Sequence, residues 1–148
     1  MDAFKSPLVL TGRILLSLVF LLSGIDKLTD IAGTAGYIAS VGLPAATSLA
    51  VLSGAFEILA ALALALGWKA RWAAFGLAQF TLLTNFLFHN YWALPADQVF
   101  MEQLMFMKNV SIAGGMLVVA ALGAGPMSLD ARHGNDTTGF RMTSRERR

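Results

Sequence analysis

"AVLSGAFEILAALALALG", residues 50–67, is small or apolar at nearly every position except for one glutamate, Glu57, near its centre. An ionised side chain in hydrocarbon costs about 3 kcal/mol on insertion scales, so such a residue usually faces a protein interior and has a partner there. The stretch therefore predicts a membrane-spanning helix. Glu57 predicts a polar contact inside the membrane.

The rest of the chain has the same membrane character, because 56% of its 148 residues are hydrophobic and only 14% are charged. A span needs about 20 predominantly apolar residues, and four stretches qualify: 7–28, 46–67, 71–90 and 104–124. A cleaved signal peptide is the alternative for the first stretch, but Arg13 interrupts it and no A-x-A cleavage pattern follows. We predict an all-α fold, an integral membrane four-helix transmembrane bundle over residues 1–130, with a flexible basic cytoplasmic tail over 131–148.

Basic residues predict the orientation of these spans. Lys5 precedes the first span, Lys69 and Arg71 lie in the short turn between the second and third, and five arginines follow the fourth. Loops rich in Lys and Arg stay in the cytoplasm, so both termini are expected there, in a multi-pass protein of the bacterial inner (cytoplasmic) membrane. Because the basic residues flank the spans, the net charge of +2 does not indicate nucleic-acid binding; the expected partner is the lipid bilayer.

The two connections on the opposite side, residues 29–46 and 90–103, are longer and poor in positive charge. Pro44 and Pro95 lie just ahead of the second and fourth spans, where proline favours the start of a helix. The segment that begins at Gly125 has turn formers and charge but no helical periodicity. We therefore expect it to belong to the flexible end of the chain.

Polar side chains recur at helical spacing of three and four within the spans, so each span has one polar or small-residue face. Glu57 lies near mid-membrane, and Arg13 and Lys108 lie closer to the two membrane surfaces, from which their long side chains can extend inward. The predicted partner of Glu57 is therefore Arg13, Lys108 or both. The candidate binding pocket comprises Arg13, Glu57, Asn85, His89, Lys108 and Asn109.

These residues also have a purely structural interpretation. Buried ion pairs fix helix register without adding much stability, because desolvation offsets their attraction. A single histidine near the interface, such as His89, is often a solvated or capping group, although its ordinary pKa suits proton exchange. Both interpretations remain open at this stage.

Several chemistries lack the residues that they require. The chain has no cysteine, which excludes disulfides, thiol nucleophiles and cysteine-bound clusters. A bis-histidine haem or a di-iron site needs more histidines and carboxylates within the spans than the sequence offers. No nucleotide-binding or zinc-protease motif occurs. We expect no metal site, no covalently bound cofactor and no catalytic residue that can be named from sequence.

The ordered set "GRILLSLVFLLSGIDKL", "FEILAALALALGWKAR", "HNYW" and "FMKNVSIAGGMLVVAALGAGPMSLD" resembles the DoxX family of small bacterial and archaeal membrane proteins. The resemblance covers residues 8–130. The residues that match family positions are Arg13, Ser23, Gly24, Lys27, Glu57, Lys108 and Asn109. The resemblance implies a four-helix inner-membrane protein, related to subunits of quinol- and thiosulfate:quinone-linked enzymes.

Three functions fit these observations. In the first, the chain is a quinone-linked or redox-associated membrane subunit, an accessory subunit of a quinone-dependent oxidoreductase, whose pocket binds a quinone while a partner protein carries the electrons. In the second, it is a non-catalytic scaffold or assembly subunit. In the third, it is a small proton-coupled transporter that acts as a homo-oligomer. Loss of activity without loss of expression on Glu57→Gln distinguishes the first from the second.

Overall fold

The computed structural model of the chain describes residues 2–134. Within this range every regular element is helical: α1 Asp2–Thr29, α2 Ile31–Ser40, α3 Ala46–Leu66, α4 Ala70–Phe88, the 3₁₀ turn η1 Tyr91–Ala93, α5 Ala96–Leu122 and α6 Leu129–Arg132. The predicted all-α class is confirmed. Residues 135–148 of the predicted tail lie outside the described residues.

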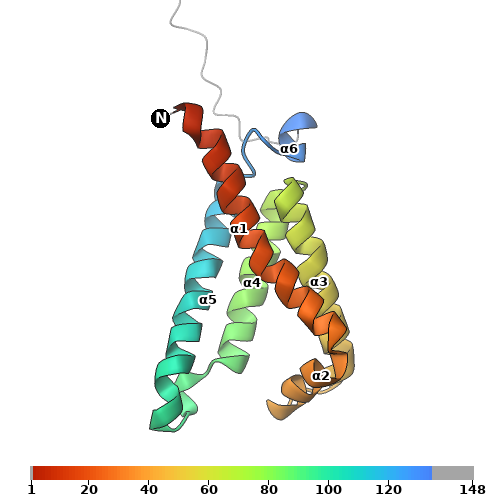
Figure 1. The fold of residues 1–148 in the computed structure, drawn as a ribbon, viewed down its shortest axis with the longest axis vertical. Helices are drawn as coiled ribbons and strands as arrows, with labels where there is room; N and C mark the ends of the chain where they lie inside the picture. Colours follow the sequence, from red (N-terminus) through yellow and green to blue (C-terminus); the bar gives the residue numbers. More distant parts are fainter. Residues whose placement is uncertain (1, 135–148) are drawn as a thin grey trace, which may run out of the picture.

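Four long helices run alternately up and down, with the N-terminus and α6 at the same end (Figure 1). Three of them are long and apolar enough to cross a membrane: Ser6–Thr29 within α1, Ala46–Leu66 and Ala96–Leu122. Large apolar side chains cover their outer faces, as at Leu59 and Leu122, which are 69% and 75% exposed. A lipid-facing surface of this kind supports the predicted membrane class. The fourth span, α4, and the cytoplasmic termini stay predictions.

Two glycines let α1 and α3 approach closely. A Cβ atom on Gly24 of α1 would lie 2.7 Å from the Gly54 carbonyl oxygen, and one on Gly54 of α3 would lie 2.9 Å from the Leu28 side chain. Small residues let helices approach closely in lipid. The α1–α3 crossing at Gly24 and Gly54 therefore fixes which side chains of the two helices meet.

Helix α1 is tilted across the bundle (Figure 1). At the N-terminal end it contacts α5, where Gly115 leaves room for Leu16. Toward its other end α1 packs against α3 and diverges from α5 (Figure 1). The backbones of α1 and α5 are therefore well separated at the end of the bundle where α2 lies (Figure 1).

The segment after α5 is packed, which corrects the prediction of a flexible end from Gly125 onward. Asp130 is buried and accepts hydrogen bonds from the backbone N–H groups of Lys69 (2.8 Å) and Ala70 (2.9 Å), at the start of α4. Arg13 donates to the carbonyl oxygens of Ala124 and, at 2.8 Å, Met127. These contacts tie α1, the α3–α4 turn and the segment leading to α6 together.

The connection expected over residues 29–46 contains a helix, α2. Asp30 caps it, because its side chain accepts a hydrogen bond from the Gly33 N–H at 2.9 Å. Tyr37 of α2 stacks on Phe88 at the end of α4, with ring centroids 5.1 Å apart. Helix α2 therefore packs against the end of α4.

Candidate functional site

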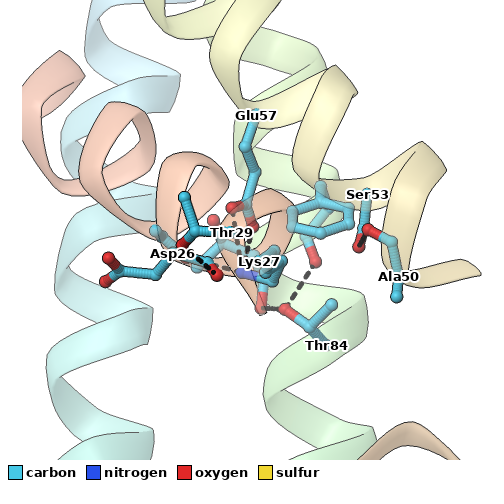
Figure 2. A network of polar contacts seen from close by, with 10 residues as sticks. Asp26, Lys27, Thr29, Ala50, Ser53, Glu57 and Thr84 are labelled. Carbon is cyan, nitrogen blue, oxygen red and sulfur yellow. Dashed lines mark hydrogen bonds and ion pairs between the residues drawn. The ribbon is translucent and has the colours of Figure 1, made fainter. Parts of the chain in front are cut away.

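Glu57 lies at the α1–α3 crossing and is 3% exposed. Its two carboxylate oxygens accept hydrogen bonds from the Lys27 ammonium at 3.0 and 2.9 Å (Figure 2). Lys27 also donates to the Ser23 hydroxyl at 2.5 Å, one turn earlier on α1. The intramembrane carboxylate is thus paired, as its cost in hydrocarbon requires.

The predicted partners of Glu57, Arg13 and Lys108, are wrong. Both terminal nitrogens of Arg13 donate to the segment after α5, about 21 Å along α1 from Lys27 at 1.5 Å per residue. The Lys108 ammonium contacts the Met105 sulfur at 3.1 Å instead. The tilt of α1 brings Lys27, at the end of that helix, level with Glu57. Counting residues along each span does not predict this contact.

The Lys27–Glu57 pair opens onto a cavity of about 440 Å³. We call this the central cavity; its wall is mostly apolar. Residues from α1, α2, α3, α4 and α5 line it, including Phe20, Ile38, Leu49, Phe80, Leu83, Leu87, Phe88 and Ile112. Its volume falls in the range of about 300–1,000 Å³ that is usual for small-molecule sites.

The structure brings four of the six predicted site residues to this cavity: Glu57, His89, Lys108 and Asn109. Asn85 is buried behind the wall, where its Oδ1 accepts a hydrogen bond from Asn109 Nδ2 at 3.0 Å and its Nδ2 donates to the Phe106 carbonyl at 3.2 Å. Arg13 does not line the cavity. Asn85 therefore positions Asn109, and Arg13 stabilises the opposite end of the bundle.

His89 lies at the C-terminal end of α4 and lines the cavity near α2. Its Nδ1 atom is 2.7 Å from the Glu102 carboxylate of α5. A carboxylate partner of this kind orients the imidazole and fixes which nitrogen holds a proton. His89 thus links α4 to α5 at the cavity rim. It is the C-cap residue of α4, as the capping interpretation expects, and its imidazole still lines the cavity.

The predicted site left out several polar residues of the wall, among them Ser53, Thr84 and Tyr37. The hydroxyl groups of Ser53 and Thr84 donate hydrogen bonds to carbonyl oxygens of their own helices. Their oxygens can still accept a hydrogen bond from a ligand. Burial raises the pKa of Tyr37, and the negative charge of Glu102 raises it further. Asp30 at the N-cap was the sequence signal for the helix that carries Tyr37.

The arrangement combines one ion pair, several hydroxyl and amide groups and a large apolar wall. It can hold an apolar ring, donate hydrogen bonds to its oxygen substituents and exchange protons at one point. No group of three His, Cys, Asp or Glu side chains suited to a metal ion occurs among residues 2–134. The chemistry that these residues offer is proton transfer and hydrogen bonding.

Comparison with known proteins matches residues 8–90 to the profile of the DoxX family. The chain is 37% identical to the inner membrane protein YphA of Escherichia coli over 130 residues, which is 88% of this chain and 93% of that protein. It is 39% identical to the inner membrane protein YqjF of the same organism over 122 residues, or 82% and 88% of the two chains. No solved structure matches.

Proposed function

Since this chain belongs to the DoxX family, we propose that it is a multi-pass protein of the bacterial inner membrane whose central cavity binds a quinone-type lipophilic ligand. In this proposal α4 is the fourth span and both termini face the cytoplasm. The similarity to two inner membrane proteins supports the location. The positively charged residues around the α3–α4 turn support the orientation.

The observation that carries the proposal is the buried Lys27–Glu57 pair at an apolar-walled cavity. A purely structural ion pair needs no cavity beside it. A quinone head group is a flat apolar ring with two carbonyl oxygens, and it enters proteins from the membrane. The aromatic side chains of Phe20, Phe80 and Phe88 offer surface for the ring, while Lys27 would donate to an oxygen by giving up its bond to the Ser23 hydroxyl.

A quinone supplies two-electron, two-proton redox chemistry when bound. On the protein side, Lys27 would hold an oxygen substituent and Glu57 would accept or return a proton at its carboxylate. The chain has no cysteine to hold an iron–sulfur cluster. We therefore propose an accessory role, with a redox partner protein supplying the electrons.

Lys27 also lines a second, shallower depression on the surface, the surface hollow, with Asp26, Asp30 and Gly33. The ammonium group that pairs with Glu57 therefore lies between the central cavity and two carboxylates near the α1–α2 corner. Figure 2 shows the Asp26 side chain pointing away from Lys27 and Glu57. This placement supports proton exchange with the aqueous side, and it also suits the alternative of a proton-coupled transporter.

The test is quinone binding by the purified chain in nanodiscs, with Glu57→Gln compared with Asp97→Asn, a carboxylate at the start of α5 that does not line the cavity. We expect saturable binding by the native chain and by Asp97→Asn, and at least about tenfold weaker binding by monodisperse Glu57→Gln. Absence of binding by the native chain would overturn the proposal. Loss of folding in Glu57→Gln together with absence of native binding would favour the scaffold.

A further inference from the structure

One charged side chain that lines the central cavity has no ion-pair partner. Lys27 is paired with Glu57. The His89 ring lies beside the carboxylate of Glu102, a residue that does not line the cavity. The Lys108 ammonium lines the cavity, and its contact is the sulfur of Met105. Among the described side chains of residues 6–134, no carboxylate forms an ion pair with Lys108.

Lys108 lies on α5, a helix long and apolar enough to span the membrane. It is four residues, or about 6 Å, into the apolar stretch 104–124. Its neighbour Asn109 bonds to Asn85 of α4 at 3.0 Å, so the backbone there is held against a packed helix. Ionisable residues at such positions usually have a partner or a role in ligand binding.

Figure 1 shows α1 and α5 diverging toward the end where α2 lies. Lys108 on α5 and Val19 on α1 both line the cavity, and both are exposed. Lys108 thus stands beside the cavity, within reach of a ligand that enters from the bilayer between α1 and α5. A positive charge at this place favours a ligand that bears a negative charge.

We infer that the ligand of the central cavity bears an ionised acidic substituent, which Lys108 recognises: an anionic lipophile such as a hydroxyquinone rather than a neutral quinone. This inference rests on the proposed function and names the class of ligand. The cavity then offers two distinct polar anchors, an anion site at Lys108 and the neutral Lys27–Glu57 pair. A molecule with a flat apolar ring, an oxygen substituent and an acidic group satisfies both.

A different role for Lys108 makes a different prediction. A lysine in a membrane helix can extend its ammonium toward lipid phosphates at the interface. In that case the charge serves the bilayer and has no influence on what the cavity binds. The two roles are separated by comparing ligands that differ in charge alone.

The experiment uses the full chain in phosphatidylcholine nanodiscs and two probes, 2-hydroxy-1,4-naphthoquinone and its methyl ether. The hydroxyl of the first is acidic and ionised at pH 7, whereas the ether is neutral and has the same ring. Dissociation constants are measured by calorimetry for the native chain, Lys108→Met, Lys108→Arg and Lys69→Met. Lys69 is the matched control, because its ammonium lies over the Trp68 ring at the other end of the bundle.

We expect the native chain to bind the hydroxy compound at least about tenfold more tightly than the ether, as a charge-assisted contact allows. Lys108→Met should abolish this preference while keeping the affinity for the ether, and Lys108→Arg and Lys69→Met should keep the preference. Equal affinity for both probes, or a preference unchanged in Lys108→Met, overturns the inference but leaves the proposed function intact. Binding of neither probe overturns both.

Discussion

Replacing Lys27 with Met should destabilise the bundle more than neutralising its partner, Glu57. The Glu57 side chain is 4% exposed and the Lys27 side chain is 26% exposed. Lys27→Met leaves a buried carboxylate without a counter-charge, which costs about 3–5 kcal/mol in comparable pairs. We expect about 3 kcal/mol, the lower end, because the partly exposed site admits some water.

Glu57→Gln should cost only about 1 to 1.5 kcal/mol, since Lys27 keeps its bond to the Ser23 hydroxyl and the amide oxygen still accepts one hydrogen bond. The double variant leaves two neutral side chains and should cost about 2 kcal/mol. The single effects sum to about 4 kcal/mol, so the coupling energy of the pair is about 2 kcal/mol.

The assay is reversible unfolding in mixed micelles with a rising fraction of SDS, followed by the fluorescence of the three tryptophans. Lys69→Met is the control for loss of a lysine outside the pair. Single effects that add to the double effect within about 0.5 kcal/mol would refute the reasoning, because independent sites add in this way. A larger effect for Glu57→Gln than for Lys27→Met would refute the assignment of Glu57 as the more buried partner.

Three further predictions follow from other contacts. Gly24→Ala should push α1 from α3 and weaken ligand binding, whereas Gly114→Ala, whose Cβ meets nothing within 4 Å, should not; calorimetry of both variants checks this. Arg13→Met should speed proteolysis after Ala124 while ligand affinity stays unchanged, and Arg13→Lys should not rescue it, because one ammonium cannot match the two-pronged contact of a guanidinium. Tyr37 should ionise above pH 10 in an alkaline absorbance titration, since its pKa is raised. Because the folded state holds the proton more tightly than the unfolded state, the free energy of unfolding should fall as pH rises past 10. This fall should be smaller in Tyr37→Phe.

The apolar stretches of the sequence predict the bounds of two helices closely. The stretches 46–67 and 71–90 match α3 Ala46–Leu66 and α4 Ala70–Phe88 within two residues. Pro95 is the N-cap of α5, and Pro44 lies two residues before α3, as their position in the sequence indicates. Helix α5 begins eight residues before the predicted span, because polar residues at its start are tolerated outside the hydrocarbon.

The partner of Glu57 was beyond sequence reasoning for a geometric reason. Helix α1 crosses the bundle at a tilt (Figure 1), and hydrophobic length alone does not specify a tilt. Tilt depends on packing, here the close approach of Gly24 to Gly54, and hydropathy does not report it. Lys27 lies in the last turn of α1, and its position along the chain does not show that it reaches Glu57.

The contacts of Arg13 constrain how the protein is made. Its carbonyl acceptors, at Ala124 and Met127, lie 111 and 114 residues later in the chain. While the chain is being synthesised, α1 therefore enters the membrane with a guanidinium that has no acceptor yet from that segment. The insertion machinery or lipid headgroups must shield this charge until α5 has been threaded. A ribosome stalled before residue 124 should consequently leave an intermediate in which α1 is more readily extracted from the bilayer than in the finished protein.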